Sequence, residues 1–445
     1  MKPAHLILAG LGLAVASFGV WSAVDSPKIV TSYDLVSSPL TPASFPVTQP
    51  AGQPGTHTVS PVTFIHPDED VKPMPAFVER GLAWLVAAQF DNGGWGAGAH
   101  ARQDIRDPRE VQVDPATTAF SAMALLRAGN TLDKGPYSEN LEKALLFMVE
   151  LVEAHPKEGP SITSISGTQP QAKLGQNIDV SMAAQLFTRV LPTLDDRPVL
   201  ENRVRAVLQT CLDKLAAAQS ADGSWNDRGG WAAVLQSAMA NNALEFADEA
   251  GVEIDKKVLE RSRAYQKSNV DAQTGSVKTE SAAGISLYTI TSNQRATAKE
   301  ARKAQELVEQ GKRDGRLDED VIMSPQALEQ LGVDAEEAKR LEEAYAQNVA
   351  TRQMLKDDEV LKGFGNNGGE EFLSHMMTSE SLVVTGGEDW EMWYARLHNL
   401  LARIQNEDGS WAGHHCITSP VFCTTAVIMA MLADRDRELL VQQAD

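Results

Sequence analysis

Cysteine, aromatic residues and excess basic charge are all scarce in this 445-residue chain. The three cysteines, Cys211, Cys416 and Cys423, are too few for a disulfide framework. Aromatic residues make up 6% of the sequence, and 40 Lys and Arg stand against 60 Asp and Glu, which leaves a net charge of −20. This charge excludes a nucleic-acid-binding role, because no basic face could dominate so negative a field.

Charge is also missing from a run near the N-terminus. Lys2 precedes an uncharged stretch from Leu6 to Val24, and Asp25 ends it. Residues 1–24 therefore predict a signal peptide or a membrane anchor, and with it an exported, periplasmic or cell-envelope protein. Residues 25–73 are rich in Pro, Ser and Thr, which predicts an extended linker because proline removes backbone donors and fixes φ.

Residues 74–445 contain a repeated turn. In three places a glutamine precedes a tryptophan by six residues, with a glycine one or two positions before the tryptophan. The pairs are Gln89 with Trp95, Gln219 with Trp225, and Gln405 with Trp411. Glycine permits the tight reversal after a helix, and the glutamine amide can bond backbone groups at the start of the next helix. We predict that these turns stabilise the scaffold.

Two kinds of helix alternate along the same region. Six segments rich in small and apolar residues suit a crowded interior: 117–129, 179–191, 231–247, 281–290, 370–384 and 422–433. More amphipathic segments such as 138–154 suit an outer layer. Six such pairs predict an all-α fold, a single α6/α6 toroid of inner and outer helices. From Asn293 to about Leu361, charges of alternating sign predict a solvent-exposed helical insertion.

The glutamine–tryptophan turns resemble the QW repeats of the squalene–hopene and oxidosqualene cyclases. The toroid that the repeats imply is shared with the β subunits of protein prenyltransferases. The resemblance covers nearly all of residues 74–445 and implies a cavity for an apolar, isoprenoid ligand. The Asp-x-Asp-Asp motif of the squalene–hopene cyclases is absent, and the nearest string is Leu317–Asp320. The Asp-x-Cys zinc ligands of the prenyltransferases are absent too.

Ionisable residues cluster where the turns of such a toroid would meet at one rim. This predicted rim includes His100, Asp114, Asp179, Asp227, Glu280, Glu370, Glu371, His414, His415 and Cys416. Clustered ionisable groups in a cleft are a sign of function. We expect acid–base catalysis by Glu370, Glu371, His414 and His415. Glu370, Ser374 and Thr378 also fall on one stripe of their helix, which would face the cavity.

Two alternatives remain open for the second half of this cluster. Imidazole and thiolate suit zinc, which predicts a metal site with His414 and Cys416 as ligands. Alternatively, Cys416 and Cys423 form a disulfide, and the acids serve as helix caps without catalysis.

Three functions follow from the sequence. The first is an exported toroid of the squalene cyclase and prenyltransferase type that binds an apolar or isoprenoid small molecule. The second is a non-catalytic scaffold of the cell envelope, which binds a protein partner through the charged insertion. The third is a polysaccharide-processing toroid, because such enzymes use the same architecture.

Overall fold

The computed structural model describes residues 71–365 and 367–441. The predicted signal peptide or anchor and almost all of the predicted linker lie outside these residues. Sixteen α-helices and one two-stranded hairpin, β1 (Val270–Asp271) with β2 (Ser276–Val277), are described. The prediction of an all-α fold is confirmed. No helix in the described ranges combines the length and the apolar character that crossing a bilayer requires.

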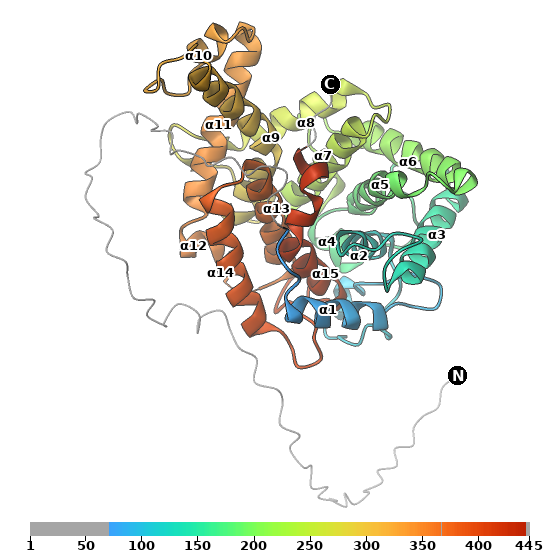
Figure 1. Cartoon of the computed structure of the whole chain (residues 1–445). Coiled ribbons are helices and arrows are strands. Elements are labelled where there is room, and N and C mark those ends of the chain that lie inside the picture. Colours follow the sequence, from blue (N-terminus) through green and yellow to red (C-terminus); the bar gives the residue numbers. More distant parts are fainter. Residues whose placement is uncertain (1–70, 366, 442–445) are drawn as a thin grey trace, which may run out of the picture.

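Six buried helices form the centre of the molecule (Figure 1). They are α2 (Pro115–Arg127), α5 (Ile178–Val190), α7 (Ala233–Glu249), α9 (Ser286–Arg313), α13 (Gly369–Thr385) and α15 (Pro420–Met431). Each packs on the next in this order, and α15 packs on α2, so the contacts run round a closed ring. Small residues allow this close packing; every residue of α13, for example, is buried.

A second layer of helices surrounds this ring. Its members are α1 (Ala76–Ala87), α3 (Ser138–Ala154), α6 (Pro198–Ala218), α8 (Lys256–Ser268), α11 (Ala335–Met354) and α14 (Glu388–Ile404). Each buries one apolar face against one or two inner helices and leaves the other face in solvent. Outer and inner helices alternate along the chain, as the sequence predicts. Short helices complete the fold: α4 (Gln169–Lys173), α10 (Pro325–Gln330), α12 (Asp358–Leu361) and α16 (Arg437–Val441).

The three glutamine–tryptophan turns make matching hydrogen bonds. In each, the glutamine Nε2 donates to the carbonyl of the glycine four residues later, at 2.7–3.1 Å. It also donates, at 2.8–2.9 Å, to a carbonyl near the start of the following outer helix. These carbonyls belong to Asn140, Val258 and Phe77. Because Gln405 follows the last outer helix and Phe77 lies in the first, this bond ties the two ends of the ring together.

The tryptophan of each turn joins its outer helix to the following inner helix. Its indole Nε1 donates to a leucine carbonyl ten residues earlier, at 2.8–3.0 Å. Its backbone N–H donates to a hydroxyl near the start of an inner helix, at 2.9 Å each time. The hydroxyls belong to Thr118, Ser237 and Thr424. We call each such turn a clasp: the glutamine joins neighbouring outer helices, and the tryptophan joins the two layers.

Glycine is required within the clasps. Gly93, Gly223 and Gly409 all have φ between +90° and +95°. A Cβ atom added to Gly93 would lie 2.4 Å from the carbonyl oxygen of Lys143, on the neighbouring outer helix. Both the conformation and the space therefore exclude a side chain at this position.

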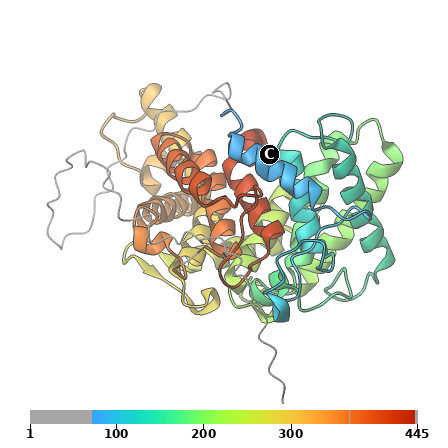
Figure 2. The ribbon, with the colours of Figure 1, turned by 90° about the horizontal axis from the view of Figure 1, so that it is seen from below.

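The structure divides the predicted insertion differently from the sequence. Residues 293–299 belong to the inner helix α9 and are buried, so the expectation that they are solvated is wrong. Only the far part of α9, α10 and the first half of α11 build a second small core, around Val308, Leu328 and Leu341. This part projects from the edge of the ring in both views (Figures 1 and 2). The ring helix therefore continues directly into the projection.

Removing the clasp amide should destabilise the ring. We expect Gln89→Ala and Gln405→Ala each to lower the free energy of unfolding by about 1–3 kcal/mol, because two carbonyls lose their donor. Urea denaturation followed by circular dichroism measures this loss. Gln209→Ala is the matched control, since among the described residues the Gln209 amide bonds only the exposed side chain of Asp213. Equal stability of the clasp variants and the control would contradict the assigned role.

Candidate functional site

The first turns of the inner helices meet at one end of the ring. We call it the clasp end, because the clasp tryptophans bond to hydroxyls there. Asp179 at the start of α5 accepts a hydrogen bond from the backbone N–H of Ala116 at the start of α2, at 3.2 Å. Tyr288 at the start of α9 donates to Glu371 at the start of α13, at 2.6 Å. These contacts bring residues distant in sequence to one end.

Glu371 is fixed by three donors. Its Oε1 accepts from the Tyr288 hydroxyl and from the backbone N–H of Phe364 at 3.1 Å. Its Oε2 accepts from the backbone N–H of Gly368 at 2.9 Å, which caps α13, and lies 3.9 Å from Nε2 of His415. Burial, followed by the charges of Glu371 and Glu370, raises the pKa of Tyr288 above its usual range. Tyr288 therefore stays a hydrogen-bond donor.

Glu370 lies beside this group and is 1% exposed. Its Oε2 accepts from the backbone N–H of Ile417 at 3.2 Å. Burial, and then the charge of Glu371, raises the pKa of Glu370 to about 8. The side chain therefore holds its proton at neutral pH. One turn further along α13, the hydroxyl of Ser374 is buried with no hydrogen-bond partner among the described residues.

The three residues His414, His415 and Cys416 take different positions. His414 is exposed, whereas His415 is half-buried and its ring lies 5.0 Å from that of Phe364. Cys416 has φ of +60° and lies close to Glu370. Burial, and then the charge of Glu370, raises the pKa of Cys416 to about 12, so it remains a thiol. The structure thus brings Glu370, Glu371, His415 and Cys416 together but leaves His414 at the surface.

Neither predicted use of the cysteines is formed. Cys416 and Cys423 are free thiols in the structure, so the disulfide is absent. Within residues 71–365 and 367–441, no three His, Cys, Asp or Glu side chains converge as metal ligands. The zinc site with His414 and Cys416 therefore has too few ligands, because His414 is exposed while Cys416 turns toward Glu370.

The remaining residues of the predicted rim differ in burial, and His100, in a turn at 100–102, is half-buried. Asp114 and Asp179 are both buried, and Asp114 caps α2 by accepting from the backbone N–H of Thr117 at 2.8 Å. Burial raises the pKa of Asp114 to about 6 and, with the charge of Asp114, that of Asp179 to about 7. Asp227 and Glu280 are exposed. Capping thus accounts for Asp114.

Helix α4 crosses the clasp end and was not predicted. The Oε1 of Gln169 accepts from the backbone N–H groups of Thr418 and Ser419, at 2.7 and 3.2 Å. Lys173 is 7% exposed, and its Nζ lies 4.3 Å from the centre of the Trp231 ring. Its positive charge acts on Glu370 and Cys416, lowering both pKa values against the larger effect of burial. Lys173 is therefore a cation next to the buried acid.

The opposite end of the ring holds a network that the sequence did not reveal. Each inner helix places one charged residue there, or just after its end. The residues, in ring order, are Arg127, Arg189, Glu245, Arg295, Glu380 and Asp436. Arg127 donates to Glu380 and to Asp436, both at 2.6 Å, and Asp436 also pairs with Arg189. Three cations and three anions thus balance within the protein.

Glu380 is the centre of this network. Its Oε1 pairs with Arg127 and its Oε2 with Arg295, at 3.1 Å. Burial alone would raise the pKa of Glu380, but Arg127, Arg295 and Arg189 outweigh it and hold the pKa below its usual value. The guanidinium groups of Arg189 and Arg295 also lie 4.6 and 5.5 Å from the centre of the Phe246 ring. This end is a closed ionic core with paired charges.

Comparison of the chain with protein-family models gives no match, and comparison with curated proteins gives none either.

Glu370 should make stability depend on pH. The carboxyl of Glu370 keeps its proton up to pH about 8 in the folded protein but only up to about 4.5 in the unfolded chain. The stabilisation is therefore complete below pH 4.5 and lost as the pH rises through 8, at about 1.4 kcal/mol per pH unit. We expect Glu370→Gln to remove this loss in urea denaturation between pH 5 and 9. Glu407→Gln, at an exposed position, is the control and should keep the pH dependence of the wild type. If Glu370→Gln kept it too, the assignment to Glu370 would be wrong.

Glu380 should be the most sensitive acid at the opposite end. We expect Glu380→Gln to lower the free energy of unfolding by about 3–5 kcal/mol, because buried Arg127 and Arg295 lose their partner. Because the pKa of Glu380 is lowered, its contribution is present above pH 4.5 and lost on further acidification. Urea denaturation at pH 7 and pH 4 measures both effects. Glu139→Gln, in an exposed pair with Lys143, should change little.

Proposed function

We propose that this chain is a ring-shaped enzyme of the terpenoid cyclase and prenyltransferase type, which donates a proton to an isoprenoid ligand in the cell envelope. The observation that carries the proposal is the buried, protonated carboxyl of Glu370 at the clasp end. A carboxyl that keeps its proton at neutral pH is suited to general acid catalysis. The closed ring and the repeated clasps support the kinship.

Each residue of the site has a role in this proposal. Glu370 donates its proton to one carbon of a double bond, which leaves a carbocation on the other carbon of that bond. Glu371, which Tyr288 and two backbone N–H groups hold in a fixed orientation, takes up a proton from the next carbon, on the far side of the carbocation. The double bond is then shifted, and the two protons balance. His415, 3.9 Å from Glu371, connects the pair to the exposed side of the loop.

The site suits an apolar ligand for an electrostatic reason. Burial and the charge of Glu371 keep the proton on Glu370 against the charge of Lys173, and burial has the largest effect. Binding an uncharged hydrocarbon would exclude water from the clasp end and leave the Glu370 proton in place. A polar ligand would bring solvent and favour ionisation of Glu370 instead.

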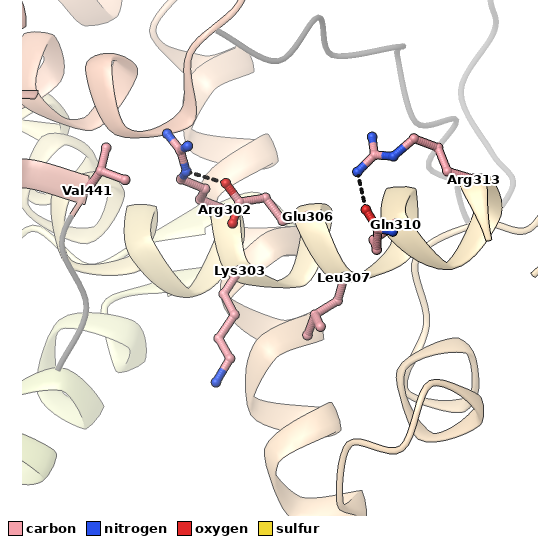
Figure 3. A pocket seen from close by; sticks show the side chains of 7 residues that line it. All are labelled: Arg302, Lys303, Glu306, Leu307, Gln310, Arg313 and Val441. Carbon is pink, nitrogen blue, oxygen red and sulfur yellow. Dashed lines mark hydrogen bonds and ion pairs between the residues drawn. The ribbon is translucent and has the colours of Figure 1, made fainter. Parts of the chain in front are cut away.

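A second candidate is the cell-envelope scaffold. It is favoured by a hollow of about 570 Å³ along the projecting part of α9 (Figure 3). Arg302, Lys303 and Arg313 line this hollow, whose charge suits an acidic segment of a partner protein. Arg302 pairs with Glu306, and Lys303 with Glu337, so part of this charge is already balanced. The ring would then serve only to carry the projecting part.

Proton transfer can be tested directly. We expect an isoprenoid lipid to be found by mass spectrometry in a solvent extract of the purified protein. Incubating the protein with this lipid in D₂O should incorporate deuterium into it. In Glu370→Gln we expect the same binding but at least ~100-fold slower incorporation, which is the usual effect of losing a general acid.

The control for this experiment is Glu407→Gln, which should incorporate deuterium at the wild-type rate. Absence of any isoprenoid from the extract, together with no incorporation from polyprenyl alcohols, would refute the enzyme and favour the scaffold. Equal rates in Glu370→Gln and the wild type would refute the role of Glu370.

A further inference from the structure

A small polar cavity lies at the clasp end, separate from Glu370. Its volume is about 150 Å³, and it is lined by hydroxyl, amide and guanidinium side chains, among them Ser161, Thr163, Gln171, Asn177 and Arg228. Helix α4 stands between the two places. Gln169 and Lys173 of α4 approach the loop of Cys416 and Thr418, whereas Gln171 of the same helix lines the cavity.

Asn177 is the unusual residue of this cavity. It is 1% exposed, and neither its Oδ1 nor its Nδ2 has a hydrogen-bond partner among the described residues. A buried amide without partners costs about 1–3 kcal/mol for each unpaired group. The backbone groups of Asn177, in contrast to its side chain, are hydrogen-bonded. Its N–H donates to Gln236 at 2.6 Å, and its carbonyl accepts from the Ser181 hydroxyl at 2.9 Å.

The position of Asn177 in α5 makes the absence of a partner more significant. Asn177 is the N-cap residue of this 13-residue helix, a position where asparagine commonly bonds the first turn. Here its side chain makes no capping bond. The amide therefore lines the cavity with its donor nitrogen, Nδ2, and its acceptor oxygen, Oδ1, both available to a ligand.

The charge around the cavity favours an anion. Arg228 is half-buried and forms no ion pair with any described residue. The N-terminus of α5 adds the positive end of a helix dipole. The nearest acid on α5, Asp179, turns its carboxylate toward Gln171 Nε2, at 2.6 Å, and the N–H of Ala116. Asp227 accepts from the Ser220 hydroxyl at 2.8 Å. Both acids thus have other partners.

We propose that this cavity is a binding site for a small hydroxy-carboxylate, whose carboxylate pairs with Arg228 and whose hydroxyl bonds Asn177. Guanidinium groups bind carboxylates with two parallel hydrogen bonds, and an amide can both donate to a hydroxyl and accept from it. The volume equals that of about five water molecules in the liquid, which suits a molecule of the size of lactate. This site is independent of the proposed proton transfer.

Isothermal titration calorimetry on the full chain tests the site with three probes: L-lactate, acetate and glycerol. We expect one lactate to bind per chain, at least tenfold more tightly than acetate, which lacks the hydroxyl, or glycerol, which lacks the charge. Arg228→Gln should weaken lactate binding at least tenfold because the cation is lost. Asn177→Asp, nearly identical in shape, should weaken it similarly by placing a negative charge beside the carboxylate.

Two surface variants are matched controls. Arg205→Gln and Asn202→Asp change the same residue types on an exposed face of α6 and should bind lactate like the wild type. Thermal unfolding shows whether each variant is folded. If Asn177→Asp does not fold, lactate binding by Arg228→Gln alone tests the proposal. Glycerol or acetate binding as tightly as lactate would overturn the proposal. So would lactate binding that both variants leave unchanged, or no saturable binding of any probe, which would indicate a cavity that holds only water.

Discussion

The hydrogen bond from the Gln405 amide to the carbonyl of Phe77 joins the last outer helix to the first. A ring of helix pairs that each contact only their neighbours has two ends, and something must fasten them together. The same amide geometry recurs at Gln89 and Gln219, so ring closure uses the device that joins neighbouring pairs elsewhere. With the ring closed, the six inner helices are buried on every side, which explains why small residues dominate them.

Closure also fixes the direction of the inner helices, and this determines the chemistry of the two ends. All six point the same way, so their N-termini meet at the clasp end; five of them end near the other end, and α9 runs past it into the projecting part. The positive dipole ends favour acids such as Asp114 and Glu371 at the first, and the negative ends favour Arg127 and Arg189 at the second. At the second end, acids from other elements neutralise the arginines. At the clasp end, no cation among residues 71–365 and 367–441 is in hydrogen-bonding contact with Glu370, which keeps its proton instead.

The sequence revealed what depends on local patterns. The clasps could be predicted because glutamine, glycine and tryptophan recur at fixed spacing, and the inner helices because their segments are rich in small and apolar residues. The grouping of Glu370 and Glu371 with His415 and Cys416 followed from the predicted rim. Tyr288 and Lys173 were missed, because a tyrosine or a lysine within a helical segment carries no signal of its neighbours. Arg295 was missed for another reason. It lies in a charged stretch that reads as solvated, and only the ring brings its partner Glu380, 85 residues away, to it.

Glu370 and Glu371 are neighbouring buried acids whose burial is compensated to different extents. Glu371 caps α13, binds Tyr288 and holds the loop at Phe364, so its burial is compensated by hydrogen bonds. Glu370 accepts a bond from the backbone N–H of Ile417 at 3.2 Å, and its side chain also bonds that of Cys416. A glutamine oxygen could accept the Ile417 bond without titrating. A carboxyl in that place provides one property that an amide lacks, a transferable proton at neutral pH. The difference between these two neighbouring acids is therefore the observation on which the proposed proton transfer rests.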